Sequence, residues 1–312
     1  GPPSSALRLP GYGAFMTSSP VVNRSPMIYV GANDGMLHGF SVAKNASDSG
    51  KERIAYVPLG AYANLTKLTS QSYAHTNFVD ASPFSGDVLI STSPTTWKTY
   101  LAGFMGSGGK GYFILDVTNP GAFSESSASS LVVLDTTNTT DADVGYMFTQ
   151  PSLHPSNPTH AVQFTMMNNN RPALILGNGV NSSNERPVLL IQYLDGAKEV
   201  FKIIASATTG LTNGLMNPQI IDLNSDGKAD VVYAGDLQGN LWKFDISAST
   251  ASGWKVSFGG APLYIAKDSG NSPQPIVAAP VYVPHPQGGI MLGFVTGRNF
   301  TTGDRTDVSE QS

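Results

Sequence analysis

An all-β fold is the architecture that this sequence predicts, on three observations. Its 33 glycines and 21 prolines are spread over all 312 residues, and no long stretch keeps a helical period. Short runs of β-branched and aromatic residues recur between turn residues, which is typical of strands joined by tight turns. Such runs are Met27–Val30, Tyr112–Leu115, Ala173–Leu176, Val188–Ile191 and Val231–Ala234. The best helical candidate is Leu59–Leu68, which follows Pro58 and has Leu or Tyr at every third position.

A strand-turn-strand unit is repeated along the chain. Met27–Phe40 aligns with Val231–Phe244, because each has a strand, a glycine, a polar turn ending in glycine and then alternating apolar residues. Looser copies are Tyr100–Asp116 and Leu174–Tyr193. A hairpin repeated in this way is the unit of a propeller blade. At about 40–50 residues a blade, the length predicts a β-propeller of roughly six or seven blades. The irregular spacing of the copies leaves a large β-sandwich as the alternative.

Composition excludes several classes of function. Eighteen Lys and Arg against 22 Asp and Glu give a net charge of −4, so no basic excess is available for nucleic acid. No apolar run approaches the roughly 18 residues that span a bilayer. The absence of cysteine excludes thiol catalysis, Cys-type zinc sites and disulfides. The abundance of Ser, Thr, Asn and Gly favours an exported protein.

The start of the chain indicates how it is divided into domains. Gly1-Pro2 resembles the scar of a cleaved tag. We therefore expect residues 1–18 to be a tag scar with an N-terminal lead-in, and residues 19–312 to form the propeller domain.

One segment, Asp222–Asp230, has a strong metal-binding pattern. Oxygen-bearing side chains stand at positions 1, 3, 5 and 9, and Gly227 at position 6 allows a sharp turn. Ca²⁺ takes six to eight oxygen ligands, whereas Mg²⁺ fits less well because it keeps its waters and demands a stricter octahedron. The predicted Ca²⁺ ligands are the side chains of Asp222, Asn224, Asp226 and Asp230 and the backbone carbonyl of Lys228.

This loop differs from an EF-hand, because its twelfth position is Tyr233 instead of Glu and both flanks are predicted strands. We expect it at the tip of a β-hairpin. A metal-free turn is the alternative, since Asp, Asn and Gly also suit tight turns. Three carboxylates in nine residues repel one another unless a cation lies between them, which favours calcium. Whether calcium only stabilises the hairpin or switches function stays open.

Candidates for catalysis are weak. The five histidines are scattered without metal-ligand spacing, and no G-x-S-x-G motif is present. Gly103–Lys110 only imitates a phosphate-binding loop, because a predicted strand follows it where Ser or Thr and a helix are needed. We expect Trp97, Trp242 and Trp254 to pack within blades. The sequence therefore predicts a protein that is not an enzyme.

The calcium loop and the residues that follow it, Tyr233–Asp245, resemble the signature of the PilC/PilY family of type IV pilus tip proteins. Other stretches resemble the C-terminal domain of the same family and occur in the same order. They are Val30–Phe40, Tyr73–His75 with Val79–Asp80, Trp97–Thr99 through Asp116–Pro120, Gly177–Ser182, Gln274–Val277 and Val295–Phe300. The resemblance extends from about Ser19 to Asp304.

The resemblance implies a modified β-propeller of about seven blades that binds calcium. It places this domain in an exported protein of the bacterial cell surface, pilus tip, outer membrane or periplasm. Its calcium ligands fall on the five residues given above. The domain is expected to support pilus assembly by opposing retraction, and the whole protein to contribute to attachment, twitching motility and virulence. The implied partners are minor pilins or the pilus tip, and a host-cell receptor bound through an N-terminal region absent from this chain. The chain stops at Ser312, so the last blade is expected to be incomplete or closed by other residues.

Two further interpretations compete with this one. The blade motif also resembles quinoprotein dehydrogenases, whose propellers hold a quinone cofactor with calcium. Those enzymes usually spread their calcium ligands over several blades and often carry a vicinal cysteine pair, which this chain lacks. An integrin-like propeller would need the calcium loop several times, and it occurs once.

Overall fold

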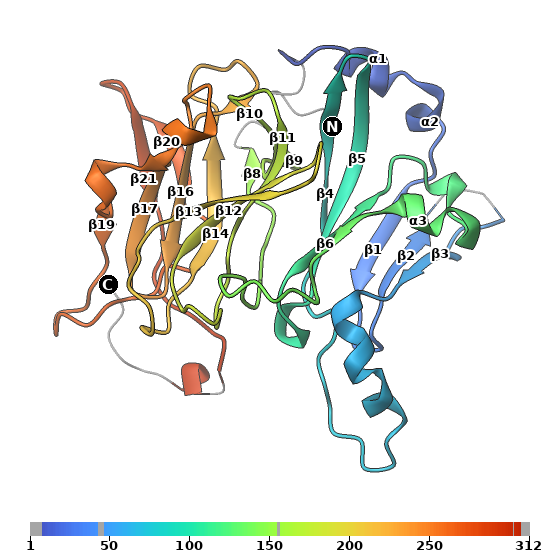
Figure 1. The fold of residues 1–312 in the computed structure, drawn as a ribbon, viewed down its shortest axis with the longest axis horizontal. Helices are drawn as coiled ribbons and strands as arrows, with labels where there is room; N and C mark the ends of the chain where they lie inside the picture. The colour runs from blue at the N-terminus through green and yellow to red at the C-terminus, as the bar shows by residue number, and fades with distance from the viewer. Residues whose placement is uncertain (1–7, 43–46, 155–156, 302, 307–312) are drawn as a thin grey trace. The chain divides into compact units, whose positions relative to one another are not determined.

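The structure, a computed structural model, describes residues 8–42, 47–154, 157–301 and 303–306. Its Cα positions separate into two compact units, which we call the N-terminal unit, Leu9–Gln150, and the C-terminal unit, Pro151–Ser312. Both consist mainly of antiparallel strands and contain only short helices (Figure 1), which confirms the all-β prediction. The described residues form six sheets of two to five strands, and the number of blades stays a prediction.

The N-terminal unit contains a three-stranded and a four-stranded sheet, ordered β1-β2-β3 and β4-β5-β6-β7. The strands are β1 (Met27–Gly31), β2 (Leu37–Ser41), β3 (Glu52–Tyr56), β4 (Phe84–Thr92), β5 (Thr95–Phe104), β6 (Tyr112–Asp116) and β7 (Val132–Asp135). The α-helices are α1 (Tyr12–Met16), α2 (Ser19–Val22) and α3 (Ala128–Leu131), and the 3₁₀ helices are η2 (Leu59–Thr69), η3 (Gly106–Gly108), η4 (Pro120–Ala122) and η5 (Glu125–Ser127).

The C-terminal unit contains two five-stranded and two two-stranded sheets in its described part. One five-stranded sheet has the order β13-β12-β11-β10-β15, and the other the order β14-β16-β17-β18 with β19 also paired to β17. The strands are β8 (Leu153–His154), β9 (Asn157–Ala161), β10 (Phe164–Met167), β11 (Pro172–Gly177), β12 (Val188–Tyr193), β13 (Val200–Ile204), β14 (Leu215–Ile221), β15 (Lys228–Ala229), β16 (Val231–Asp236), β17 (Asn240–Asp245), β18 (Lys255–Val256), β19 (Tyr264–Ile265), β20 (Val281–Pro284) and β21 (Ile290–Gly293). The 3₁₀ helices are η6 (Ala251–Gly253), η7 (Phe258–Gly260) and η8 (Gly303–Arg305).

The four repeated units of the sequence are antiparallel hairpins, as predicted. They are the strand pairs β1–β2, β5–β6, β11–β12 and β16–β17. Gly103 and Phe104 end β5, and the residues up to Lys110 lead to β6, so Gly103–Lys110 belongs to a hairpin, as predicted. Among the described residues, no helix combines the length and the apolar character that crossing a bilayer requires.

Buried side chains from facing strands form a separate core in each unit. In the N-terminal unit Leu37, Phe113 and Leu115 belong to one cluster, and in the C-terminal unit Ile175 and Val232 belong to another. The three tryptophans are packed as predicted: Trp97, Trp242 and Trp254 are all at most 6% exposed.

The helical prediction for Leu59–Leu68 is only partly correct. The segment forms the 3₁₀ helix η2, and Leu65 packs against the core. However, Leu59 and Tyr62 are 52% and 58% exposed, so the predicted apolar face is not buried as a whole. A 3₁₀ helix places residues i and i+3 directly above one another, and here most of that row faces solvent.

The first helix lies inside the predicted lead-in. Tyr12 of α1 is 1% exposed and donates a hydrogen bond to Asp87 on β4 at 2.7 Å. The indole of Trp97 donates to the carbonyl of Pro10 at 2.8 Å. Residues 10–16 are therefore packed onto the four-stranded sheet, and the boundary between residues 18 and 19 stays a prediction.

The turn from β16 to β17 is organised by a buried carboxylate. Asp236 has no exposed surface, and its Oδ1 accepts hydrogen bonds from the backbone amides of Gln238 and Asn240, both at 2.9 Å. Its Oδ2 accepts from the side chains of Asn213 at 3.0 Å and of Asn240 and Trp242 at 2.9 Å each. These five donors satisfy the charge, so a buried Asp fixes the turn that the glycine pattern predicts.

Candidate metal centre

The predicted calcium loop lies at the tip of a β-hairpin, where the sequence placed it. Asp222–Asp230 connects β14 to β16, and Ile221 pairs with Val231 directly below the loop. The turn uses left-handed backbone at Ser225, with φ of 62°, and at Gly227, with φ of 90°. Ser225 lies in the left-handed region that other residues occasionally adopt, whereas a φ of 90° is unfavourable for any residue with a Cβ, so glycine at position 6 lets the loop close.

Asp222 spans the loop with both of its carboxylate oxygens. Oδ1 accepts a hydrogen bond from the backbone amide of Asp226 at 3.1 Å, and Oδ2 from that of Gly227 at 2.8 Å. Burial raises the pKa of Asp222, the amides lower it, and the nearby charge of Asp226 raises it, with a net upward shift. Asp222 is therefore a half-buried carboxylate in an environment that lacks a compensating cation among the described residues.

Asn224 and Asp226 lie on the exposed side of the same loop. Asn224 Oδ1 accepts a hydrogen bond from the amide of Asp226 at 2.8 Å, and Asp226 Oδ1 accepts one from the amide of Lys228 at 2.9 Å. These are Asx-type turns that shape the backbone. Each carboxylate or amide oxygen has a further lone pair, so these bonds leave acceptor capacity for a cation.

Asp230 ties the loop to the neighbouring sheet. It is 4% exposed, and its Oδ2 accepts a hydrogen bond from the amide of Leu223 at 2.8 Å. Its Oδ1 accepts from the side chain of Asn168 at 3.1 Å. Asn168 also donates to the carbonyls of Ala229 at 2.8 Å and Ile246 at 3.2 Å. Sequence reasoning missed Asn168, because it stands 62 positions from Asp230 and no local pattern marks it.

A short parallel strand adds a second link between the loop and the β10 sheet. Lys228, the predicted carbonyl ligand, belongs to β15, which pairs in parallel with β10 through Met166 and Met167. The loop is therefore bonded both to its own hairpin and to the other five-stranded sheet of the C-terminal unit. A change in the loop can reach both sheets.

The donor chemistry of the loop fits a hard cation. Its oxygens come from three carboxylates, one amide side chain and a backbone, which is the ligand set that Ca²⁺ prefers. Within the described ranges, no three His, Asp or Glu side chains are grouped so that they could hold a metal ion, so the structure does not bring Asp222, Asp226 and Asp230 together as a ligand set. Asn224 and Asp226 are exposed, and each side chain accepts one hydrogen bond, so these two predicted ligands are held by few contacts.

The histidine with the most acidic neighbours is held as a structural group. His38 Nε2 lies 2.9 Å from Asp34 Oδ2, and its Nδ1 bonds to Glu52. Burial alone lowers the pKa of His38, but the bonds with Glu52 and Asp34 outweigh it and raise the pKa above the ordinary value. Such a histidine holds its proton between two carboxylates, which makes it a poor general base.

These features define an all-β domain of repeated hairpins with an acidic loop between two sheets. Residues 10–312 match the model of the PilY1 β-propeller domain. The chain therefore belongs to this family, which confirms the resemblance predicted from its motifs.

Named relatives agree with this assignment. The chain is 38% identical over 307 residues to the type IV pilus biogenesis factor PilY1 of Pseudomonas aeruginosa, a match that covers 92% of this chain and 24% of that protein. It is 34% identical over 308 residues to a PilY1 homolog of Xylella fastidiosa, covering 94% of this chain and 19% of the homolog. The chain thus spans about a quarter or less of the length of these relatives.

A solved structure has the same fold. The crystal structure of the Pseudomonas aeruginosa PilY1 C-terminal domain superposes with a TM-score of 0.76 at 35% sequence identity. The superposition covers 96% of this chain and 58% of that one. The β-propeller prediction is therefore confirmed at the level of the fold.

Proposed function

We propose that this chain is the calcium-binding, non-enzymatic domain of a type IV pilus biogenesis protein. It supports pilus assembly by opposing retraction, and the whole protein contributes to attachment and twitching motility. The observation that carries the proposal is the Asp222–Asp230 loop, whose oxygen ligands stand in calcium-binding order at a junction of two sheets. The names of the relatives, type IV pilus biogenesis factors, support the role in the pilus.

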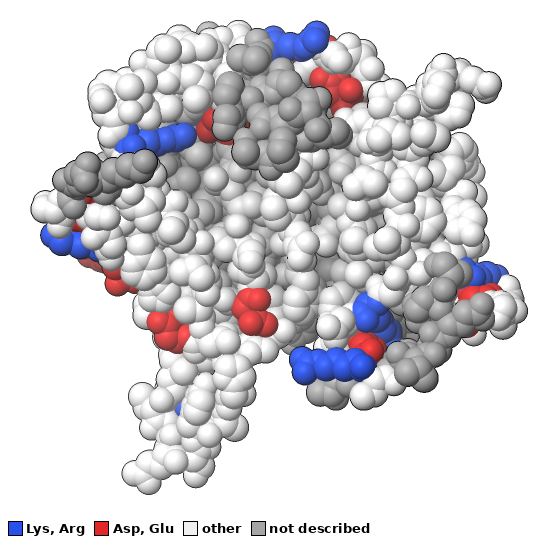
Figure 2. Space-filling model, turned by 180° about the vertical axis from the view of Figure 1, so that it is seen from behind, with Lys and Arg blue, Asp and Glu red and all other residues white. Residues whose placement is uncertain are grey.

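The proposed location is outside the cytoplasm, at the bacterial surface or pilus tip, and the proposed partners are minor pilins. Charged side chains are few and scattered on the face shown in Figure 2, which suits contact with another protein better than with nucleic acid. A host receptor, if it belongs to the whole protein, is assigned to the part of the relatives' length that this chain does not span. Deletion of the parent gene, scored for surface pili with and without the retraction motor, tests the role in assembly.

The loop gives this proposal a physical basis. Calcium, when bound, would supply two positive charges to the carboxylates of Asp222, Asp226 and Asp230. Asp230 and Asn168 join the loop to the β10 sheet, and β15 adds a backbone pairing to it. The residues of the loop therefore link its charge state to the packing of two sheets, and a surface formed there can respond to calcium.

We expect one calcium ion per chain, with a dissociation constant in the micromolar to millimolar range of extracellular sites. Calorimetry on chelator-stripped protein measures it. Asp226→Asn should weaken binding at least about tenfold, because Kd follows the number of ligand charges. Replacing Asp226 and Asp230 together should abolish binding. Asp245→Asn, on β17 outside the loop, is the matched control and should bind normally. Absence of binding heat, or several equivalent sites, would contradict the one-loop assignment.

We also expect no enzymatic turnover. The chain should not oxidise alcohols or sugars with an artificial electron acceptor after loading with a quinone and calcium. The reason is that no nucleophile or acid–base pair stands out among the described residues, and His38 is bound on both ring nitrogens. A coloured quinone complex with turnover above the protein-free rate would support the quinoprotein alternative instead.

A further inference from the structure

Among the described residues, Asp230 is the predicted calcium ligand that a side chain from outside the loop holds in place. Asn168 donates a hydrogen bond to Asp230 Oδ1 at 3.1 Å, while Oδ2 accepts from the amides of Leu223 at 2.8 Å and Asn224 at 3.4 Å. Asp230 is 4% exposed. A carboxylate that is buried and bonded at both oxygens keeps one orientation, so Asp230 is a fixed point of the loop.

The backbone around Asn168 is a hydrogen-bonded turn between β10 and β11. The amide of Asn170 donates to the carbonyl of Met167, and the amide of Met167 donates to the carbonyl of Arg171, both at 2.9 Å. Asn170 has left-handed backbone, with φ of 62°, a conformation in which asparagine is enriched. The bonds within this turn therefore set the position of Asn168 without help from the calcium loop.

The side-chain amide of Asn168 is oriented by two backbone carbonyls besides the Asp230 carboxylate. Its Nδ2 donates to the carbonyl of Ala229 at 2.8 Å and to that of Ile246 at 3.2 Å. Ile246 follows β17, and its own amide donates to the carbonyl of Asp230 at 2.9 Å. One side chain thus contacts the backbone of the loop, the carboxylate of Asp230 and the end of β17. The contact with Asp230 is therefore set by the surrounding sheets and not by the loop alone.

We propose that Asn168 is a positioning residue of the calcium site, which holds the Asp230 carboxylate in the orientation that binds the ion. This role deepens the proposed function and rests on it. Hydrogen bonds from surrounding residues orient the carboxylates that bind metals, and losing such a partner costs about 10–100-fold in metal affinity. The described residues do not bring the three carboxylates of the loop together. A ligand that is already fixed therefore lowers the ordering cost of binding.

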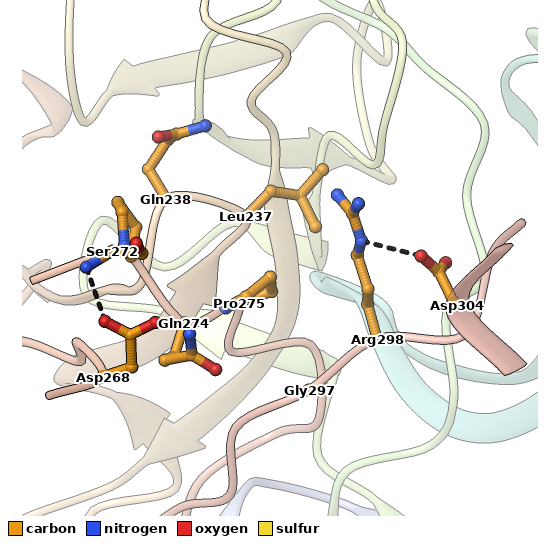
Figure 3. Close-up of a pocket in the computed structure, with 10 residues that line it drawn as sticks. Leu237, Gln238, Asp268, Ser272, Gln274, Pro275, Gly297, Arg298 and Asp304 are labelled. Atoms are coloured by element: carbon orange, nitrogen blue, oxygen red, sulfur yellow. Dashed lines mark hydrogen bonds and ion pairs between the residues drawn. The ribbon is translucent and has the colours of Figure 1, made fainter. Parts of the chain in front are cut away.

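Alanine substitutions with two controls test this role by calorimetry on chelator-stripped protein. Asn168→Ala should raise the Kd for calcium at least about tenfold. Asn169→Ala is the matched control, because Asn169 stands in the same turn but donates to the hydroxyl of Tyr193 at 2.9 Å. Gln238→Ala is the distant control: the Gln238 amide also donates to a backbone carbonyl, at 2.8 Å, but it lines the cavity shown in Figure 3, to which the calcium loop contributes no residue. Both controls should leave the Kd unchanged.

Melting temperatures and NMR separate positioning from a merely structural role. A structural Asn168 would lower the melting temperature equally with calcium and with chelator, whereas a positioning residue makes the calcium-induced rise smaller in Asn168→Ala than in wild type. In chelator, the losses caused by Asn168→Ala and Asp230→Ala should not add in the double variant, because both remove the same contact. In ¹⁵N-labelled wild type, calcium should shift the side-chain amide signals of Asn168 and spare those of Asn169.

The outcomes distinguish failure of this role from failure of the proposed function. If the wild-type chain gives no heat with calcium, the calcium proposal and the role of Asn168 are both wrong. If wild type binds calcium and Asn168→Ala binds it with the same Kd, only the role of Asn168 is wrong. The same conclusion follows if Asn169→Ala loses as much affinity as Asn168→Ala, or if the calcium-induced rise in melting temperature is unchanged in Asn168→Ala.

Discussion

Replacing Asp236 by alanine should destabilise the C-terminal unit by about 3–5 kcal/mol, the largest loss we expect from a single substitution in the chain. The carboxylate is fully buried and accepts five hydrogen bonds, three of them from the side chains of Asn213, Asn240 and Trp242. Alanine leaves these buried donors without an acceptor. Each such donor carries its own desolvation cost, so the losses accumulate.

Urea unfolding followed by tryptophan fluorescence measures the effect, because Trp242 donates directly to Asp236. Asp245→Ala is the matched control. Asp245 ends β17 as Asp236 ends β16, but it is only half-buried, and its Oδ1 accepts from the amide and hydroxyl of Ser247 at 3.1 and 2.6 Å. The control should cost about 1 kcal/mol or less. Equal unfolding midpoints for the two variants would refute the role assigned to Asp236.

Asp236 also shows which features of the fold could be predicted from the sequence and which could not. The residues Gly235–Asn240 predicted a tight turn, and the turn is present, with Gly239 at φ of 76°. Local patterns succeed there because turn, register and alternation are properties of adjacent residues. An Asp beside a glycine turn is normally exposed, however, and nothing local distinguishes a buried one. Its burial depends on Asn213, which is 23 positions away.

The candidate metal loop was likewise predictable in part. Its place at the tip of the β14–β16 hairpin followed from the flanking strands, and the structure confirms that place. The attachment of the loop to β10 through Asn168 and β15 could not be predicted from the sequence, because it joins residues about sixty positions apart.

Removing calcium should leave the chain folded. The hairpin below the loop has its own apolar contacts: Ile221, Val231 and Tyr233 are buried together, and Tyr282 and Leu292 pack against them. A ligand that binds only the folded state contributes about 2.7 kcal/mol at a hundredfold excess over its Kd. For a unit of this size, chelation should therefore lower the melting temperature by about 5–10 °C. Calorimetric scans with and without chelator, on wild type and on Asp226→Asn, measure this difference, and the variant should show little response.

If the calcium-free chain folds, we expect calcium to affect function by changing the charged surface of the loop. Binding of a divalent ion changes the charge of the three carboxylates, Asp222, Asp226 and Asp230, from −3 to −1. A change of this size alters how the loop meets a charged or polar partner. On the proposed function, a bacterium whose protein carries Asp222→Ala should therefore export it at the normal level. It should lose most of its surface pili while the retraction motor is active, and regain them when the motor is deleted.

The Asp236→Ala variant gives this experiment its reference for failed folding, because it removes stability without touching a predicted calcium ligand. Export is measured by immunoblot of surface fractions, and pili by shearing and electron microscopy. If Asp222→Ala is exported normally but causes a pilus defect, while Asp236→Ala is depleted before export, the loop has a direct role in function. If Asp222→Ala is depleted to the same extent as Asp236→Ala, calcium serves to fold the domain, and the idea that calcium switches its function must be abandoned. Among the described residues, the half-buried Asp222 side chain accepts hydrogen bonds from amides of its own loop alone, so the contacts favour the first outcome.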